Sequence, residues 1–311
     1  MLARLSRAFF HTLADSSVMK RMASGYGMRQ PHGFARRFIA GETVDEAIVA
    51  AQAIRAAGMT LTLDYLGESV ATMREADAAT RAYLSIIQRI VAAGIDRNLS
   101  LKLTQLGLTV DRATCVDNLR RILDAAAPHE FFVRVDMENS PYTAATLDIF
   151  ETMWQQEYRN AGVVLQSYLP RSVADARRMN ELGARVRLVK GAYQEPKGVA
   201  YQAKAAVDAA FIEIMKLLLT DGTYPAIATH DPAMIAATRT FAAARGIPPS
   251  NYEFQMLYGV RRDLQAQLSA DGYRVRVYVP FGREWFPYFM RRLGERPANV
   301  AFVIRGVLRE R

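Results

Sequence analysis

The sequence of 311 residues is poor in the residues that build disulfides and metal sites. Cys115 is the single cysteine, which excludes an internal disulfide framework and is typical of a protein kept in a reducing compartment. The four histidines are far apart in the chain, and neither an H-E-x-x-H motif nor a cysteine pair is present: His11, His32, His129 and His230. We therefore expect no metal site and read Cys115 as structural.

Long apolar runs are missing as well. No stretch approaches the roughly 18 apolar residues that a membrane-spanning helix needs. Residues 1–10 resemble the start of a short amphipathic helix, and they contain no long apolar region before a small-residue cleavage site. We expect a cytoplasmic protein with no signal peptide and no transmembrane helix.

The charges are unbalanced but dispersed. Lysine and arginine number 40 against 31 acidic residues, a net charge of +9, which favours contact with something acidic. No run of five or six basic residues occurs, so an arm that binds nucleic acid is not expected. An anionic cofactor, an anionic substrate or an anionic membrane surface remains compatible with this charge.

The chain changes in pattern near residue 58. Residues 1–57 have apolar residues at helical spacing and no strand pattern, and Thr43 with Glu46 forms a capping box before a helix over 47–54. From Met59 onward, apolar strands alternate with amphipathic helices. The predicted strands are 60–65, 99–103, 131–137, 162–169, 185–191, 225–230, 252–259 and 274–279. The predicted helices between them are 70–93, 111–127, 143–158, 172–182, 199–220, 232–245 and 261–270.

Eight strand–helix units over about 250 residues predict the α/β class and a (β/α)8 barrel of the TIM type. An open, doubly wound sheet is the alternative. It is disfavoured because no G-x-G-x-x-G follows the first strand and no phosphate-binding G-x-x-x-x-G-K-[ST] occurs. We expect a helical N-terminal extension, residues 1–57, packed on a catalytic barrel, residues 58–311.

Polar side chains stand at or near the end of every predicted strand. Active sites of such barrels lie at the C-terminal ends of the strands, and a buried polar group without a partner costs free energy. A single residue of this kind is more often half of a structural ion pair, but eight strands with the same feature indicate a ligand. The residues concerned are Asp64, Glu68, Lys102, Gln105, Asp136, Glu138, Gln166, Arg187, Lys190, Thr229, His230, Gln255 and Tyr278.

The last predicted strand leads into an aromatic-rich helix that carries adjacent arginines. Pro280 and Gly282 are expected to end the strand, and the helix is expected to end near Gly294. Helical spacing places Tyr288, Arg291 and Arg292 on one side of this helix. The pair is either a solvated surface feature or a clamp for a carboxylate or phosphate, because a guanidinium fork can donate to two oxygens of either anion at once.

The strand residues limit the chemistry. A serine triad lacks its G-x-S-x-G turn. Lys102 and Lys190 keep a Schiff-base aldolase open, because a desolvated lysine can be a nucleophile, although strand lysines equally bind phosphates or carboxylates. The excess of cations over acids suits an anionic cofactor together with an anionic substrate.

Several segments together resemble the proline dehydrogenase family. They lie in family order over residues 60–305 and include R-L-V-K-G-A-Y at 187–193, Y-E-F-Q-M-L-Y-G at 252–259, A-T-H at 228–230, and Y-V-P-F-G at 278–282 followed by Arg291 and Arg292. Members of this family use FAD to oxidise L-proline to Δ1-pyrroline-5-carboxylate, the first step of proline catabolism. The short chain is similar to the monofunctional bacterial form.

The resemblance implies roles for individual residues. Arg291, Arg292 and Lys102 would hold the proline carboxylate, with Tyr193, Leu257 and Tyr278 as walls around the ring. Asp136 would support Lys102 and the charge balance, and Glu68 would pair with Arg291 as a gate. Arg187 would lie beside flavin N5, which receives the hydride from ring C5. The other residues implied to bind FAD are Met137, Gln166, Lys190, Gly191, Ala192, Thr229 and His230.

The resemblance also implies partners. The family passes electrons to membrane quinones, so we expect a cytoplasmic enzyme that contacts the inner face of the membrane peripherally, and a pyrroline-5-carboxylate dehydrogenase that takes the product. Tyr278 is implied to favour proline over 4-hydroxyproline. Asp231 departs from the family, many of whose members have asparagine there, which puts a cofactor contact in doubt. The residues identify no base for the amine proton.

Overall fold

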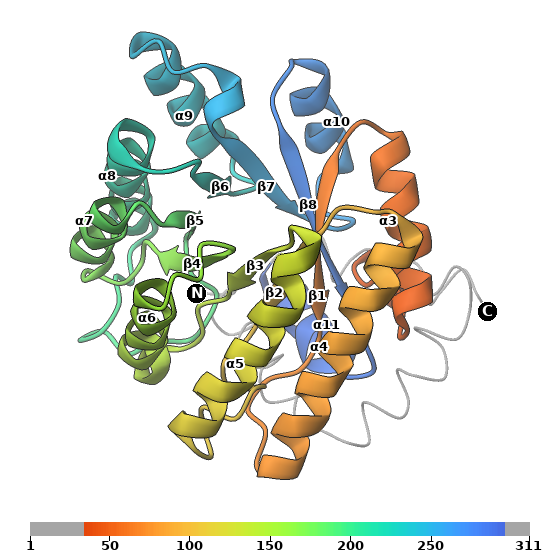
Figure 1. Cartoon of the computed structure of the whole chain (residues 1–311). Helices are drawn as coiled ribbons and strands as arrows, with labels where there is room; N and C mark the ends of the chain where they lie inside the picture. The colour runs from red at the N-terminus through yellow and green to blue at the C-terminus, as the bar shows by residue number, and fades with distance from the viewer. Residues whose placement is uncertain (1–33, 296–311) are drawn as a thin grey trace.

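The computed structural model describes residues 34–295 and contains a closed barrel of eight parallel strands in the order β1 to β8 (Figure 1). The (β/α)8 prediction is confirmed, and the open-sheet alternative is wrong. The strands are β1 (Thr60–Tyr65), β2 (Asn98–Leu101), β3 (Phe132–Val135), β4 (Ala161–Gln166), β5 (Arg185–Val189), β6 (Ala226–Ala228), β7 (Glu253–Leu257) and β8 (Val275–Phe281). Ring closure comes from β1 pairing with β8 over six residues.

The helices cover the outside of the barrel (Figure 1). They are η1 (Phe34–Arg37), α3 (Val44–Ala56), α4 (Met73–Ala93), α5 (Arg112–Ala126), η2 (Ala127–His129), α6 (Ser140–Gln155), α7 (Ser172–Leu182), α8 (Lys204–Asp221), α9 (Pro232–Ala244), η3 (Pro249–Asn251), α10 (Arg262–Ala270) and α11 (Trp285–Glu295). Thr43 and Thr72 begin α3 and α4 with capping boxes, in which a threonine and a glutamate satisfy each other's backbone amides. Left-handed glycines, Gly94 and Gly183, end α4 and α7.

The part of the predicted helical extension that the structure describes, residues 34–57, holds η1 and α3 and no strand. Apolar residues of α3, among them Ala47 and Ile54, join the same hydrophobic cluster as the barrel strands. The amphipathic pattern expected over residues 1–10, and His11 and His32, lie outside the described residues. A division between residues 57 and 58 stays a prediction.

Most of the predicted strands extend too far at their C-terminal ends. Residues 102–103, 136–137, 167–169, 190–191, 229–230 and 258–259 were assigned to strands but lie in loops. The chain turns there: the amide of Gln105 donates to the Lys102 carbonyl at 3.2 Å, and the amide of Leu169 donates to the Gln166 carbonyl at 3.1 Å. These polar residues therefore belong to the loops over the C-terminal face of the barrel.

Pro280 does not end β8, which continues through Phe281. β7 pairs with β8 only as far as Leu257 and Tyr278, so Pro280 lies beyond the end of β7. A proline, which has no amide hydrogen, is tolerated where a strand has lost a neighbour. Gly282, with a φ of +127°, then turns the chain toward α11.

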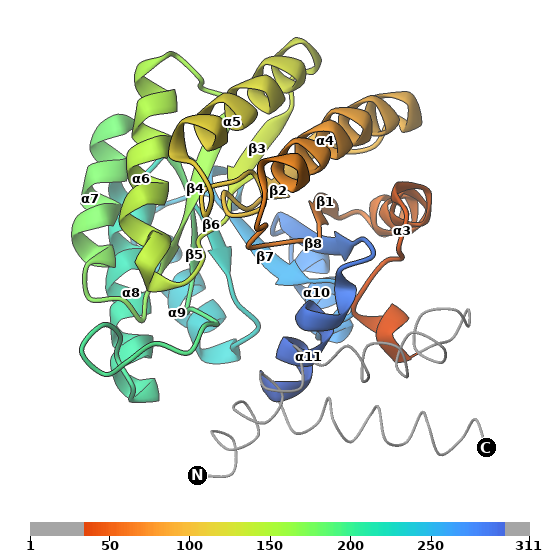
Figure 2. The same cartoon turned by 90° about the horizontal axis from the view of Figure 1, so that it is seen from below.

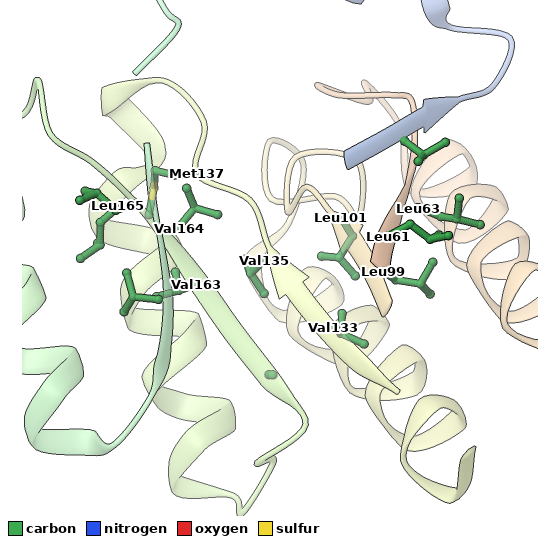
Figure 3. Packing of buried hydrophobic residues seen from close by; sticks show 14 of the residues in the cluster. Leu61, Leu63, Leu99, Leu101, Val133, Val135, Met137, Val163, Val164 and Leu165 are labelled. Atoms are coloured by element: carbon green, nitrogen blue, oxygen red, sulfur yellow. The ribbon is translucent and has the colours of Figure 1, made fainter. Parts of the chain in front are cut away.

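Alternation along the strands separates an apolar outer layer from a polar interior. Leu61, Leu63, Leu99 and Leu101 are fully buried and point toward the surrounding helices (Figure 3). The residues at the alternate positions face the interior, and they include Asp64, Ser100, Arg134, Arg187, Glu253, Gln255, Arg276 and Tyr278. The barrel centre is thus filled with charged and amide groups, which require partners at every level.

A second, smaller cluster forms beside the C-terminal end of β8. Phe38 and Ile39, which follow η1, pack with Leu66 and with the aromatic face of α11, where Trp285 and Phe289 are almost fully buried. Figure 2 shows η1 and α11 on the same side of the molecule. This cluster fixes the orientation of α11, the helix that carries both arginines. Among residues 34–295, no helix has the length and apolar character needed to cross a membrane.

Candidate active site

A cavity of about 450 Å³ lies at the C-terminal ends of the strands. It is lined by every site residue predicted from the sequence except Glu68: Lys102, Asp136, Met137, Gln166, Arg187, Lys190, Gly191, Ala192, Tyr193, Thr229, His230, Leu257, Tyr278, Arg291 and Arg292. These residues come from seven strand ends and from α11, so the barrel brings together groups that are up to 190 positions apart in the chain. A volume of this size is typical of a small-molecule site.

Asp136 lies at the centre of the charge network. Its Oδ2 accepts a hydrogen bond from the Tyr278 hydroxyl at 2.7 Å and from Lys102 Nζ at 3.3 Å. Its Oδ1 accepts one from Arg187 Nη1 at 2.8 Å. One carboxylate therefore connects a cation from β5, a cation that follows β2 and a tyrosine from β8.

Lys102 is buried between Asp136 and a second carboxylate, that of Asp64, which lies 3.4 Å from its Nζ. Burial alone would lower the pKa of Lys102, but Asp64 and Asp136 outweigh it and hold the pKa well above its ordinary value. The amine is therefore charged at neutral pH and is a poor nucleophile. Lys190 is held by Asp208 at 2.5 Å and by Asp231 at 2.7 Å. Neither lysine has the environment of a Schiff-base nucleophile.

Arg187 is fixed on all sides. Its Nε donates to Gln255 Oε1 at 2.5 Å, its Nη2 donates to Ser100 Oγ at 2.9 Å, and its guanidinium stands 5.1 Å from the centre of the Tyr278 ring. Gln255 in turn donates to Glu253 Oε1 at 2.5 Å, and Glu253 accepts from Arg276 at 2.8 Å. A continuous chain of side chains thus runs through the barrel and sets the position of the Arg187 head group.

The arginine doublet lies inside the molecule and is not the solvated surface pair that the sequence also allowed. Arg292 is 9 % exposed and stacks over Tyr288 at 5.1 Å. Arg291 Nη1 donates to Glu68 Oε1 at 2.6 Å. Burial and the carboxylate of Glu68 raise the pKa of Tyr193, which keeps its hydroxyl protonated beside Arg291.

Glu68 lines a second cavity, of about 490 Å³, together with its partner Arg291. Lys102, Tyr288 and Arg291 line both cavities. The Glu68–Arg291 pair therefore stands between an inner and an outer cavity, where a gate would lie.

The inner cavity has features that fit a flavin cofactor. Gln166 Oε1 is buried and accepts no hydrogen bond from any residue within 34–295, although its side chain lines the cavity. A buried amide oxygen of this kind requires a donor from a ligand or water. The loops after β5 and β6 supply further lining residues, Lys190, Gly191, Thr229 and His230, three of which have polar side chains.

Asp231, the departure from the family pattern, is neutralised by its neighbours. The hydrogen bond from Lys190, with help from the Ala233 amide, the charge of Lys190 and a hydrogen bond from Lys204, lowers the pKa of Asp231 to about 2, while burial acts in the opposite direction. Its Oδ1 also accepts from the amide of Ala233 at 3.0 Å and caps α9. The additional negative charge is thus compensated by lysines and by a helix N-terminus.

Four contributors to the site were given no individual contact by the sequence, although Asp64 and Gln255 were expected at strand ends and Tyr288 beside the arginines. Asp64 pairs with Lys102, Ser100 and Gln255 hold Arg187, and Tyr288 stacks on Arg292. Gln255 is two residues before Leu257 on β7, and Tyr288 is four residues before Arg292 on α11, so strand and helix periodicity places both on the side of the cavity. No group of metal-ligating side chains occurs within the described part of the chain.

Glu138 is a further buried acid, behind the cavity wall. It is 2 % exposed, and burial raises its pKa to about 7, while hydrogen bonds from Thr104 and the charge of Lys102 act in the opposite direction. Cys115 is buried beside this region, and burial raises the pKa of its thiol to about 12, consistent with a structural role.

A raised carboxyl pKa makes stability depend on pH. The stability associated with protonated Glu138 is fully present below the ordinary pKa of 4.5 and is lost as the pH rises to about 7. We expect the melting temperature of wild type minus that of Glu138→Gln to fall across this interval and to level off above it. Calorimetry over a pH series measures the difference. Exposed Glu213, changed to glutamine on α8, is the control and should show no such trend.

Known proteins resemble this chain throughout its length. The family model described as "Proline dehydrogenase" matches residues 47–305. Proline dehydrogenase 1 of Bacillus subtilis (strain 168) is 41% identical over 304 residues, which cover 98% of this chain and 99% of the relative. Proline dehydrogenase of Deinococcus radiodurans is 39% identical over 313 residues, covering 99% of this chain and 100% of the relative.

Among solved structures, proline utilization A (PutA) from Bdellovibrio bacteriovorus, inactivated by N-propargylglycine, superposes with a TM-score of 0.78 at 30% identity. The match covers 84% of this chain and 32% of that protein, so the chain spans about a third of the length of the solved relative. The "Bifunctional protein PutA" of Escherichia coli is 29% identical, and the match covers 24% of its length.

Proposed function

The chain belongs to the proline dehydrogenase family, and from this premise and the geometry of the inner cavity we propose how it binds and oxidises L-proline. The reaction is the FAD-dependent oxidation of proline to Δ1-pyrroline-5-carboxylate. The observation that carries the proposal is that Arg291 and Arg292 line the same cavity as Lys102 and Arg187. The cations of Arg291, Arg292 and Lys102 suit a carboxylate. Gln166 and Lys190, which line the same cavity, suit a flavin nucleotide.

The substrate site is proposed to hold proline at two points. Arg291, Arg292 and Lys102 bind the carboxylate through charged hydrogen bonds, which fix one end of a small ring. Tyr193, Leu257 and Tyr278 close around the carbon atoms and exclude water. Both oxygens of the Glu68 carboxylate accept from Arg291, at 2.6 and 3.4 Å, so the pair would cover the bound substrate.

FAD, when bound, supplies the acceptor for the hydride that leaves ring C5 of proline. The residues that would hold it are Arg187, Gln166, Met137, Lys190, Gly191, Ala192, Thr229 and His230. Arg187 would place a fixed positive charge beside the flavin, which stabilises added electrons without reorganisation. Asp136 holds Arg187, Lys102 and Tyr278 at once, so it sets the distance between cofactor and substrate groups.

The amine of proline must lose a proton before hydride transfer. The buried carboxylates nearest the inner cavity, Asp64 and Asp136, are both occupied by Lys102. We therefore assign no side chain as the base. Because the pKa of Lys102 is high, its amine stays charged, which suits a carboxylate ligand. A charged amine cannot act as the nucleophile of a Schiff-base aldolase, so this alternative is not supported at this site.

The electron acceptor and the next enzyme are proposed from the family. A membrane quinone would take the electrons, and a pyrroline-5-carboxylate dehydrogenase would take the product. A net charge of +9 would favour peripheral contact of a cytoplasmic protein with an anionic bilayer. Flotation with anionic vesicles is the measurement. Loss of binding at high salt would support an electrostatic contact, and no flotation at low salt would count against one.

The visible spectrum tests the proposed reaction most directly. The purified protein is expected to be yellow, and anaerobic addition of L-proline should bleach its flavin bands. D-Proline and L-lactate are the controls, because one reverses the geometry of the carboxylate and the other lacks the ring. A colourless protein, or bands that persist with L-proline, would rule out the proposed function.

Tyr278 is expected to determine ring specificity. Its hydroxyl is held on Asp136 at 2.7 Å, so the phenol ring forms a fixed wall against any added ring substituent. Replacement with serine removes this wall and should raise the ratio of kcat/KM for 4-hydroxyproline to that for proline by roughly 10- to 200-fold. Tyr258→Ser, on the loop after β7, is the control. A wild-type preference for hydroxyproline would contradict the assignment.

A further inference from the structure

The position of Glu68 depends on a loop that has few anchors. The chain between β1 and α4 is tied at its start by the Leu66 amide, which donates to the Phe281 carbonyl at 2.8 Å, and at its end by Thr72, the N-cap of α4. Glu68 lies between these points. Its place opposite Arg291 must therefore come from contacts in the middle of the loop.

Two of those contacts are made by Thr104, in the loop after β2, and a third comes from the Thr109 hydroxyl, which donates to the Val70 carbonyl at 2.6 Å. The Ser69 amide donates to Thr104 Oγ1 at 2.8 Å, and the Val70 amide donates to the Thr104 carbonyl at 3.2 Å. Ser69 has a φ of +55°, a left-handed conformation that a non-glycine residue adopts at a cost. A conformation of this kind persists where neighbouring contacts impose it, and the Thr104 hydroxyl supplies such a contact.

Glu138 in turn orients the hydroxyl of Thr104. It donates to Glu138 Oε2 at 2.5 Å, and the Thr104 amide donates to Glu138 Oε1 at 3.1 Å. A hydroxyl has one proton, so donation to Glu138 leaves its lone pairs for the Ser69 amide. Thr104 and Glu138 are 0 % and 2 % exposed, so water does not compete for these groups.

We propose that Glu138 and Thr104 form a latch that holds the Glu68 loop in the closed position between the inner and outer cavities. Both are positioning residues: Thr104 orients the loop, and Glu138 orients Thr104. The inference rests on the proposed function, in which the Glu68–Arg291 pair covers bound proline. It adds that this pair is kept closed by Thr104 and Glu138, whose side chains line neither cavity.

Thr104→Val tests the latch, because it replaces the hydroxyl by a methyl group of similar size. The KM for proline should rise about 5-fold, equivalent to about 1 kcal/mol for one hydrogen bond, while kcat stays within about twofold. Thr104→Ser should restore the wild-type KM. Glu138→Gln should raise KM in the same direction, because its amide would donate to Thr104 Oγ1 and compete with the Ser69 amide.

Thr238→Val is the matched control. Thr238 is also a fully buried threonine, but its hydroxyl donates to the Met234 carbonyl within α9, far from the Glu68 loop in the chain. This variant should leave the KM for proline unchanged. A Thr104→Val effect no larger than that of Thr238→Val would overturn the latch.

A double-mutant cycle separates the latch from general damage. If Thr104 acts through Glu68, Thr104→Val should have no further effect on KM in a Glu68→Ala background. An equal effect in both backgrounds would overturn the proposal. Hydrogen exchange gives a readout that needs no substrate: residues 66–72 should exchange faster in Thr104→Val and Glu138→Gln than in wild type.

If the hydrogen-exchange rates of residues 66–72 are the same in Thr104→Val, Glu138→Gln and wild type, the latch proposal is wrong, even if proline is the substrate. Failure of L-proline to reduce the wild-type protein, with faster exchange in the variants, would instead leave the loop anchored as described and overturn only the link to proline.

Discussion

Replacing Arg292 with methionine is expected to raise the KM for proline by roughly 10- to 150-fold, the equivalent of the 1.5–3 kcal/mol that a hydrogen bond to a charged group contributes. Methionine keeps the length and the apolar packing of the side chain but removes the guanidinium. Arg292 is 9 % exposed and stacks on Tyr288, so bulk water would not replace it as a carboxylate ligand. Steady-state kinetics with an artificial electron acceptor measures the change.

Arg283→Met provides the comparison. Arg283 precedes α11 and is exposed, so the same chemical change there should leave KM unchanged. Arg291→Met should also raise KM, and it releases Glu68 from its partner as well. A normal KM in both the Arg291 and the Arg292 variant would remove the carboxylate clamp from the proposal.

The second large effect is expected at Asp136. Asp136→Asn removes the negative charge that three side chains share: Lys102 keeps its pair with Asp64, whereas Arg187 loses the carboxylate with which it pairs. A buried ion pair that loses one partner costs about 3–5 kcal/mol, because the remaining charge is uncompensated. Urea unfolding followed by circular dichroism should show a loss of this size.

Asp148→Asn is the control for this experiment. Asp148 pairs with Arg112 on the surface, where both side chains are at least half exposed. An exposed pair contributes about 0–1 kcal/mol, so this variant should be nearly as stable as wild type. Equal stabilities for Asp136→Asn and wild type would mean that Asp136 does not balance the charge of the cavity.

The order of the elements could be predicted from the sequence because each carries its own local signal. These signals depend only on residues close together in the chain. They are the capping box at Thr43, the glycines at residues 94 and 183, and the apolar periodicity. Strand ends could not be predicted in this way. Lys102 and Lys190 continue the strand pattern but lie beyond the strand ends: the Lys102 carbonyl accepts from the Gln105 amide in a turn, and the Lys190 carbonyl accepts from the Tyr168 amide in the loop after β4.

The membership of the cavity followed from the rule that active sites lie at the C-terminal ends of barrel strands. The bonds within it did not, since they depend on the register between strands. Asp64 is level with Ser100, and this alignment lets Asp64 reach Lys102 from the neighbouring strand. A shift by one residue would turn Asp64 outward, and no local sequence signal sets this register.

The pair formed by Glu253 and Arg276 inside the ring has a consequence for how barrels of this kind diverge. Each of the two is the other's charge partner at that level, and neither side chain is more than 15% exposed. Loss of either one alone would leave the other ion without this partner in a closed space, whereas joint replacement by two neutral residues would remove both charges. Lineages that depart from this sequence should therefore change both positions together, through short-lived intermediates of low stability.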